Sequence, residues 1–117
     1  MIKVTVLYPK AEGKWFDHDY YQNVHIPLSV RLLGPAIRSV TVERGLAPGA
    51  PWPNPVFFAI AGFVCESVEA YTRALVPHMK RLQDDVANYT DAEAIIQVSE
   101  IVEVHVSRNC QVNSPRA

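Results

Sequence analysis

The sequence has no excess of charge of either sign and no long apolar run. Among its 117 residues, 11 basic side chains are balanced by 12 acidic ones. Nucleic acids and anionic membrane surfaces attract proteins through clustered positive charge, so neither partner is expected. No apolar stretch reaches the roughly 18 residues that a membrane-spanning helix requires. These absences favour a soluble protein that binds neither nucleic acid nor membrane.

Cysteine is also scarce. Cys65 and Cys110 lie far apart, belong to no CxxC or CxxH pattern, and no HxH, HxxxH or HExxH occurs either. A disulfide framework or a metal site is therefore not expected, and the reducing cytoplasm is the expected location. The first ten residues, MIKVTVLYPK, lack the basic start and long apolar segment of a signal peptide.

What the sequence does contain is an alternation of short apolar segments with turn signals. Strands are expected over residues 2–8, 36–44, 56–64 and 94–106, and helices over residues 17–33 and from Ser67 to about Val86. Asp17 and Ser67 are the expected N-caps of the two helices. Residues 45–55 hold two glycines and four prolines, which indicates a stiff loop. The order βαββαβ predicts an α+β, ferredoxin-like fold, with both helices on one face of a four-stranded antiparallel sheet. We expect one domain over residues 1–106 and a polar tail over residues 107–117.

The strand expected over residues 56–64 is apolar at every position. A strand with one face in water alternates between apolar and polar residues, so something must cover its second face. The sheet of a second copy is the economical cover, which predicts a homodimer. The alternative is a central strand with apolar residues and no partner.

The helix expected over residues 17–33 contains both a histidine and a proline. On a helical wheel an apolar arc forms, with His25 at its edge. The members of this arc are Tyr20, Tyr21, Val24, Leu28 and Leu32. Pro27 donates no backbone hydrogen bond, so the helix should loosen around residues 23–27 and open a small-molecule pocket beside His25. Alternatively, His25 fills core space or caps a broken turn.

The second helix repeats this combination, because Pro77 precedes His78. On its wheel His78 lies within an apolar face that also holds Tyr71, Leu75, Leu82 and Val86. The two histidines are candidates for a shared cavity, although the sequence does not place them relative to each other.

Further candidates are single residues with two interpretations each. Cys65 is a core residue or a nucleophile. Arg31 is a clamp for an anionic substrate or lies along the apolar surface with its charge in water. Trp52 is a pocket lid or a dimer contact. Asn88, Tyr89 and Thr90 end the second helix and either cap it or line a pocket.

Two segments resemble a known family. WFDHDYYQNVHIPL (Trp15–Leu28) and DDVANYTD (Asp84–Asp91) are similar to the EthD family, named for ethyl tert-butyl ether degradation, and the resemblance extends over about residues 2–105. It implies a dimeric α/β barrel, with the motif histidine at His25 and the motif tyrosines at Tyr20 and Tyr21. The wider superfamily includes cofactor-independent monooxygenases, isomerases, polyketide cyclases and haem-binding enzymes, and some isomerase relatives pair a histidine with a cysteine, here His25 and Cys65.

Together these features predict a cofactor-independent oxidoreductase- or isomerase-type enzyme acting on a small apolar or aromatic ligand. His25 and Tyr21 are the expected catalytic residues. The expected pocket residues are Tyr20, Leu28, Arg31, Trp52, Cys65, His78, Asn88, Tyr89 and Thr90. No metal or cofactor is expected, with haem as a minor alternative. The competing hypothesis is a non-catalytic accessory or ligand-binding protein that supports a partner monooxygenase, as the family resemblance implies.

Overall fold

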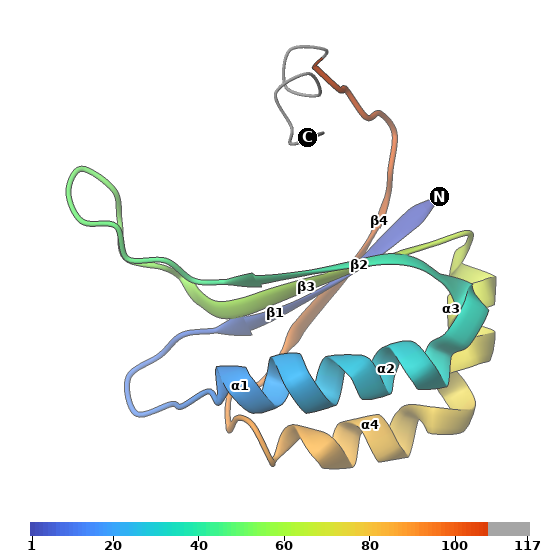
Figure 1. The fold of residues 1–117 in the computed structure, drawn as a ribbon, viewed down its shortest axis with the longest axis horizontal. Helices are drawn as coiled ribbons and strands as arrows, with labels where there is room; N and C mark the ends of the chain where they lie inside the picture. The colour runs from blue at the N-terminus through green and yellow to red at the C-terminus, as the bar shows by residue number, and fades with distance from the viewer. Residues whose placement is uncertain (108–117) are drawn as a thin grey trace, which may run out of the picture.

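A four-stranded antiparallel sheet carries all the helices on one face (Figure 1). The computed structural model describes residues 1–107. The elements are β1 (Ile2–Pro9), α1 (His18–Tyr20), η1 (Tyr21–His25), α2 (Ile26–Leu33), η2 (Gly34–Ala36), β2 (Ile37–Arg44), β3 (Phe57–Cys65), α3 (Val68–Leu75), η3 (Val76–His78), α4 (Met79–Val86) and β4 (Ile95–Glu100). The strand order is β2-β3-β1-β4. The predicted ferredoxin-like α+β fold is confirmed.

The first helical segment is continuous from α1 through α2, but its middle turn is wide. Asp17 caps it, because its carboxylate accepts the backbone N–H of Tyr20 at 3.0 Å. The five residues of η1 form a π-helical turn, in which the N–H of Ile26 reaches back to the carbonyl of Tyr21. Pro27 follows at once and cannot donate a backbone hydrogen bond. The predicted loosening before Pro27 is therefore confirmed.

The wide turn changes which side chains point inward. Val24, predicted to lie in the apolar arc, is 44% exposed, so this assignment was wrong. The buried side chains of the segment are Tyr21, His25, Ile26, Ser29 and Leu33. A five-residue turn shifts the following positions around the helix axis, whereas the helical wheel assumes 3.6 residues per turn. His25 thus lies in the buried face and not at its edge.

The second helical segment is interrupted near its proline. The hydroxyl of Ser67 caps α3 by accepting the N–H of Ala70 at 3.1 Å, as predicted. The 3₁₀ turn η3, which contains Pro77, then separates α3 from α4. A proline inside a helical segment removes one backbone hydrogen bond, which accounts for the break.

Strand β4 is shorter than the predicted strand over residues 94–106, because it ends at Glu100. Its neighbour β1 begins at Ile2, which pairs with Glu100. Beyond this pair, one more backbone hydrogen bond is formed, from the N–H of Ile101 to the carbonyl of Met1. Residues 101–107 therefore have no strand to pair with and leave the sheet (Figure 1). All but one residue of the predicted tail 107–117, Cys110 included, lies outside the described residues.

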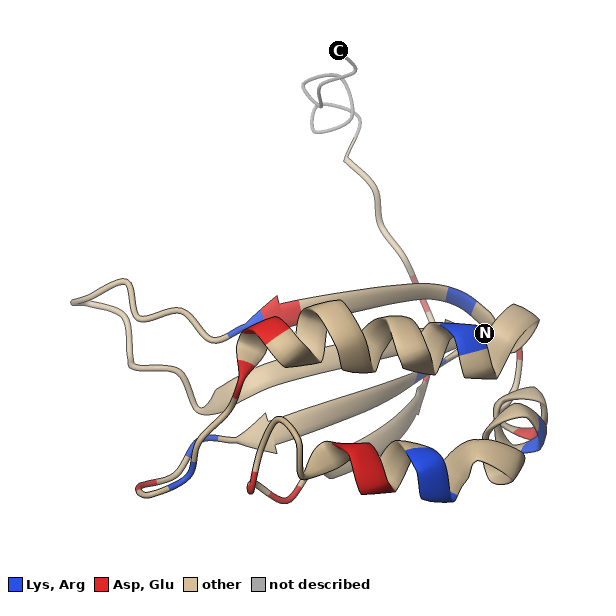
Figure 2. Ribbon diagram, turned by 60° about the horizontal axis from the view of Figure 1, so that its bottom comes forward, with Lys and Arg blue, Asp and Glu red and all other residues tan. Residues whose placement is uncertain are grey.

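The proline-rich residues 45–55 form the predicted loop. It joins β2 to β3 and projects from the body on the side of the sheet away from the helices (Figure 1). Basic and acidic residues are interspersed along the ribbon (Figure 2). Within residues 1–107, no helix has the length and apolar character needed to cross a membrane.

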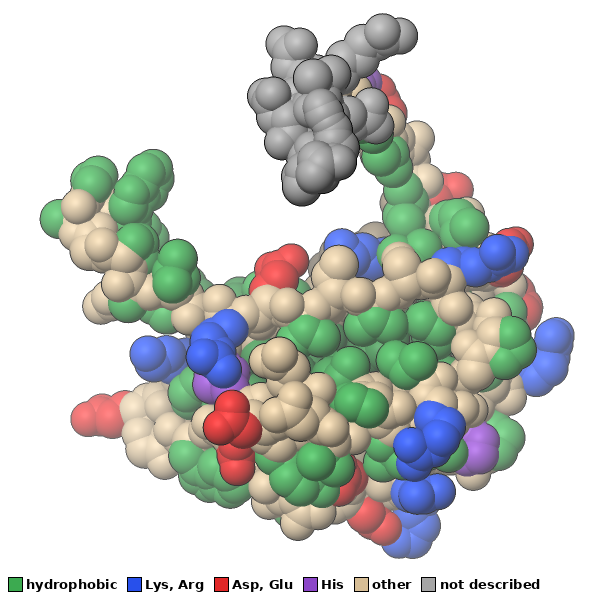
Figure 3. All heavy atoms as spheres, viewed as in Figure 1, with side chains coloured by type: hydrophobic (Ala, Val, Ile, Leu, Met, Phe, Trp, Pro, Cys, Tyr) green, Lys and Arg blue, Asp and Glu red, His purple; other side chains and the backbone are tan. Residues whose placement is uncertain are grey.

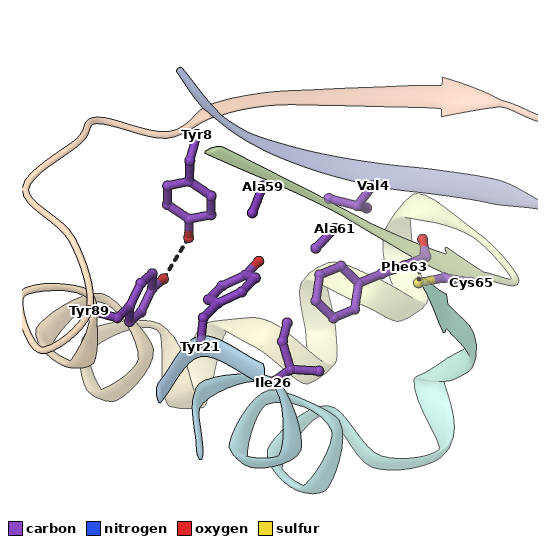
Figure 4. Packing of buried hydrophobic residues seen from close by; sticks show 9 residues of the cluster. All are labelled: Val4, Tyr8, Tyr21, Ile26, Ala59, Ala61, Phe63, Cys65 and Tyr89. Atoms are coloured by element: carbon purple, nitrogen blue, oxygen red, sulfur yellow. Dashed lines mark hydrogen bonds between the residues drawn. The ribbon is translucent and has the colours of Figure 1, made fainter. Parts of the chain in front are cut away.

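The core lies between the sheet and the helices (Figure 4). The buried residues of its main cluster are Val4, Tyr8, Tyr21, Ile26, Ala59, Ala61, Phe63, Cys65 and Tyr89. Ala59 and Ala61 on β3 are 1% and 0% exposed, and the Tyr21 hydroxyl points toward them (Figure 4). These two small side chains leave the space that the tyrosine rings occupy.

A larger side chain at Ala61 should therefore destabilise the protein. Overpacking a full core costs about 1–3 kcal/mol, so Ala61→Leu should lower the free energy of unfolding by that amount. The matched control is Ala47→Leu in the exposed loop, which should change it by less than about 0.5 kcal/mol. Urea unfolding of both variants measures the difference, and equal stabilities would contradict this account of the core.

Candidate active site

A cavity of about 940 Å³ lies between the helices and the sheet. Its lining residues are Val6, Tyr8, Tyr21, His25, Ile26, Ser29, Leu33, Phe63, Tyr71, Leu75, Met79, Leu82, Gln83, Val86, Ala92, Glu93, Ala94 and Ile96. Most of these are apolar, and hydrophobic side chains gather between the sheet and the helices in the space-filling view (Figure 3). An apolar hollow with a few polar groups is the usual form of a small-molecule site.

His25 reaches this cavity from η1 and is held by Asp85 on α4. Its Nδ1 lies 2.8 Å from Oδ2 of Asp85, and the two side chains are only 10% and 13% exposed. A carboxylate accepts hydrogen bonds, so Nδ1 carries the proton and donates it. In neutral His25 the other ring nitrogen, Nε2, then holds the free lone pair.

Nε2 of His25 is the ring nitrogen that the bond to Asp85 leaves without a hydrogen-bond partner among the described residues. No buried side-chain nitrogen or oxygen within residues 1–107 lacks a hydrogen-bond partner. The hydrogen bond of the His25 ring is the one from Nδ1 to Asp85. Nε2 must therefore keep accessible surface, and the 940 Å³ cavity is the hollow that His25 lines. An accessible lone pair on a residue that lines an apolar cavity is what a general base needs.

The second oxygen of Asp85 is also engaged. Oδ1 accepts the hydroxyl of Tyr20 at 2.6 Å and the side-chain amide of Asn88 at 3.0 Å. Burial alone would raise the pKa of Asp85, but the hydrogen bonds from Tyr20, His25 and Asn88 outweigh it and hold the pKa below its ordinary value. Asp85 is thus an ionised acceptor that fixes the orientation of His25.

Aromatic rings surround His25. Tyr21 stacks on it at a centroid distance of 5.7 Å, and Tyr89 lies at 4.6 Å. The hydroxyls of Tyr8 and Tyr89 are hydrogen-bonded at 2.6 Å, as Figure 4 shows. Burial raises the pKa of Tyr8, Tyr21 and Tyr89, so all three hydroxyls stay protonated at neutral pH. Tyr8 and Tyr21 line the cavity as neutral polar groups.

Four predicted pocket residues lie next to the site but do not line the cavity. Tyr20 and Asn88 hold Asp85, and Tyr89 is fully buried beside His25. The hydroxyl of Thr90 donates to the carbonyl of Trp15 at 2.6 Å and accepts the N–H of Ala92. Tyr20, Asn88 and Tyr89 therefore contact the His25–Asp85 pair from outside the cavity, whereas Thr90 holds the neighbouring backbone. A sequence pattern does not distinguish such residues from residues that line a pocket.

Other predicted residues lie away from the cavity. His78 is in η3 and lines no part of it, so the two histidines do not share this cavity. Cys65 is completely buried, its thiol contacts the carbonyl of Phe63 at 3.8 Å, and burial raises its pKa, which fits the core interpretation. Trp52 is 66% exposed on the projecting loop. Leu28 and Arg31 face a separate outer groove.

Asp85 and Tyr8 belong to the site but were not among the residues predicted from the sequence. Asp85 lies 60 positions from His25 in the chain, so no local spacing links the two residues. Its one signal is its place inside the DDVANYTD segment. Tyr8 continues the alternation of Val4 and Val6 along β1, and this period of two could have placed it on the core face.

The two motif segments around the site lie side by side. Phe16 and Thr90 form an isolated antiparallel bridge, and the N–H of Asp17 donates to the carbonyl of Tyr89 at 2.7 Å. The side chain of Asp91 accepts the N–H of Trp15 at 3.0 Å. These bonds join the start of the first helical segment to the end of the second, next to the His25–Asp85 pair.

Within residues 1–107, no three histidine, cysteine, aspartate or glutamate side chains cluster as metal ligands. The fold and this site define a class: ferredoxin-like α+β proteins with a cavity between sheet and helices, in which a histidine of the cavity wall is hydrogen-bonded to a carboxylate behind it. Residues 14–93 match the model of the EthD domain. The chain belongs to the EthD family, as its motif segments indicated.

Solved structures support both the family and the fold. An EthD-like protein from Ralstonia eutropha JMP134 is 42% identical, with a TM-score of 0.82 over 89% of this chain and 94% of that one. An ethyl tert-butyl ether degradation family protein from Bacillus halodurans C-125 is 22% identical, with a TM-score of 0.64 over 87% and 99%. A Dabb family protein with a ferredoxin-like fold from Mesorhizobium loti MAFF303099 is 13% identical, with a TM-score of 0.54 over 87% and 97%. The search of curated proteins gave no match.

Asp85 should make the stability of the protein depend on pH. Its pKa is lower in the folded chain than in the unfolded chain, so its contribution to stability is complete above the unfolded pKa, about 3.9, and is lost as the pH falls through the lower, folded value. Asp85→Asn should therefore lose less stability than the wild type between pH 5 and pH 2. Urea midpoints across this range measure it, with the exposed Asp19→Asn as control. Parallel pH profiles of wild type and Asp85→Asn would refute the assignment.

Proposed function

We propose that this chain is a cofactor-independent enzyme that moves a proton on a small apolar or aromatic substrate, with His25 as the general base. The observation that carries the proposal is the His25–Asp85 pair, which leaves Nε2 of a cavity-lining histidine without a hydrogen-bond partner among the described residues. Its substrate would be a carbon acid, such as a ketone or lactone with a C–H bond beside the carbonyl. Such a proton is one that an imidazole base can remove when the resulting anion is stabilised.

The residues around the cavity would each have a separate role in this reaction. Nε2 of His25 takes the proton, and the ionised Asp85 stabilises the imidazolium that forms. The protonated hydroxyl of Tyr21 donates a hydrogen bond to the substrate oxygen as negative charge develops there. The apolar walls, such as Phe63 and Leu82, exclude water and strengthen these interactions.

Return of the proton from His25 to another carbon of the substrate completes an isomerase-type reaction. If dioxygen instead takes up the electron pair of the substrate anion, a C–O bond forms, the resulting peroxide anion takes the proton back from His25 to give a hydroperoxide, and the outcome is of the oxidoreductase type. Both outcomes need the same first step, the transfer of a proton to Nε2. The competing function, a ligand-binding accessory protein, would use the same cavity without that step.

Exchange of substrate hydrogen with solvent tests the proton transfer directly. Ketones and lactones that raise the melting temperature of the protein would be incubated with it in D₂O, and loss of the C–H signal followed by NMR. His25→Ala should slow the exchange by about 10²-fold or more, because it removes the base. The matched control is His78→Ala, outside the cavity, which should exchange at the wild-type rate. Ligands that bind wild type tightly without any exchange would establish the accessory function instead.

We also propose that the chain forms a homodimer through the sheet face away from the helices. Alternation along β3 places Ile60 and Val64 on that face, where they are half-buried. The residues after β4 add exposed apolar side chains at every second position: Val102, Val104 and Val106 are 84%, 74% and 62% exposed. This segment and the proline-rich loop both project on that side of the sheet (Figure 1). An unpaired segment with strand periodicity next to an apolar face fits pairing with a second copy.

Charge placed on this segment should separate the copies. Val102→Asp combined with Val104→Asp introduces carboxylates where the second copy would pack, so the variant should sediment as a monomer at concentrations where the wild type is a dimer. Val76→Asp, at an exposed valine on the helical side, is the control and should leave the sedimentation coefficient unchanged. A monomeric wild type in analytical ultracentrifugation would exclude the homodimer.

A further inference from the structure

A second hollow, of about 530 Å³, lies on the outer side of the helices, between the first helical segment and α4. We propose that this groove binds a small organic anion, a carboxylate carried on a short apolar body. The lining residues are Asn23, Val24, Pro27, Leu28, Arg31, Arg81, Asp84, Asp85 and Asn88. The proposal is independent of the chemistry assigned to His25, which does not line the groove.

The two carboxylates in the wall of the groove are already occupied. Asp84 forms an ion pair with Lys80 at 2.8 Å. Both oxygens of Asp85 accept hydrogen bonds, Oδ2 from His25 and Oδ1 from Tyr20 and Asn88. Neither carboxylate therefore depends on an arginine of the groove as a partner.

The two arginines of the groove, unlike its carboxylates, have no charged partner among the described residues. Within residues 1–107, no carboxylate lies within 4.0 Å of the guanidinium of Arg31 or of Arg81. They enter the same hollow from two different helices, α2 and α4. A guanidinium group presents paired N–H donors that match the two oxygens of a carboxylate. The groove thus offers two unpaired cations and no unpaired anion.

The rest of the groove is suited to the body of such a ligand. Val24, Pro27 and Leu28 provide an apolar surface on the first helical segment. Val24 is 44% exposed there, because the π-helical turn leaves it on the outer side of the helix. The side-chain amide of Asn23 adds a polar group at the same wall. A flat or short apolar group that carries one carboxylate fits this combination.

The groove and the cavity share a wall. Asp85 lines the groove, while its hydrogen-bond partner His25 lines the cavity. A ligand in the groove would therefore lie next to the carboxylate that holds His25. This position makes the groove a site from which an anion can affect the cavity without entering it.

Benzoate and its neutral analogue benzamide test the proposal by NMR titration of the full chain. Benzoate should shift the amide signals of Asn23 and Asn88, and benzamide should not. Arg31→Gln combined with Arg81→Gln should weaken benzoate binding at least tenfold. The matched control, Arg44→Gln combined with Arg73→Gln, makes the same change in net charge elsewhere and should bind as wild type does. Binding should also weaken with added salt, because the arginines are exposed.

Leu75→Ala separates the groove from the cavity, since Leu75 lines the cavity and not the groove. Benzoate should shift the same groove signals in this variant. The proposal is overturned if benzoate shifts cavity residues such as Phe63 and Leu82 alone, if benzamide binds as well as benzoate, or if both arginine double variants bind equally.

Discussion

The hydrogen bond between His25 and Asp85 is the constraint on which the site depends. It joins η1 to α4 over 2.8 Å between two side chains that are almost withdrawn from water. A buried carboxylate is costly unless hydrogen bonds replace its lost water, and Tyr20 and Asn88 complete this replacement on its other oxygen. The pair therefore sets the spacing of the two helical segments and, with it, the width of the cavity beneath them. The same bond leaves Nε2 as the ring nitrogen with a free lone pair.

The π-helical turn and Pro27 explain why this bond can form. In a regular helix the periodic pattern would put Val24 inside and His25 at the border. The five-residue turn instead brings His25 into the buried face and leaves Val24 outside, at the groove. Extra residues in a helical turn are often found at functional sites. Here one local irregularity shapes both hollows, which lie on the two sides of Asp85.

The order of elements, the caps at Asp17 and Ser67 and the loosened helix could all be predicted from the sequence, because they depend on neighbours in the chain. The end of β4 could not, since the alternation of valines continues to Val106 while the partner strand β1 stops at Ile2. Asp85 was missed for a similar reason: a carboxylate 60 residues from its histidine leaves no periodic signal. Local patterns thus predicted the elements and the histidine, and contacts between distant segments completed the site.

Ala59 and Ala61 have a consequence for how the site can vary among proteins of this fold. Both are buried on β3, and the hydroxyl of Tyr21 points toward them (Figure 4). A bulkier residue at either position would push the ring of Tyr21 toward the cavity and reduce the room for a ligand. The volume of these two side chains on β3 therefore limits the room available to a ligand without any change at His25 or Asp85.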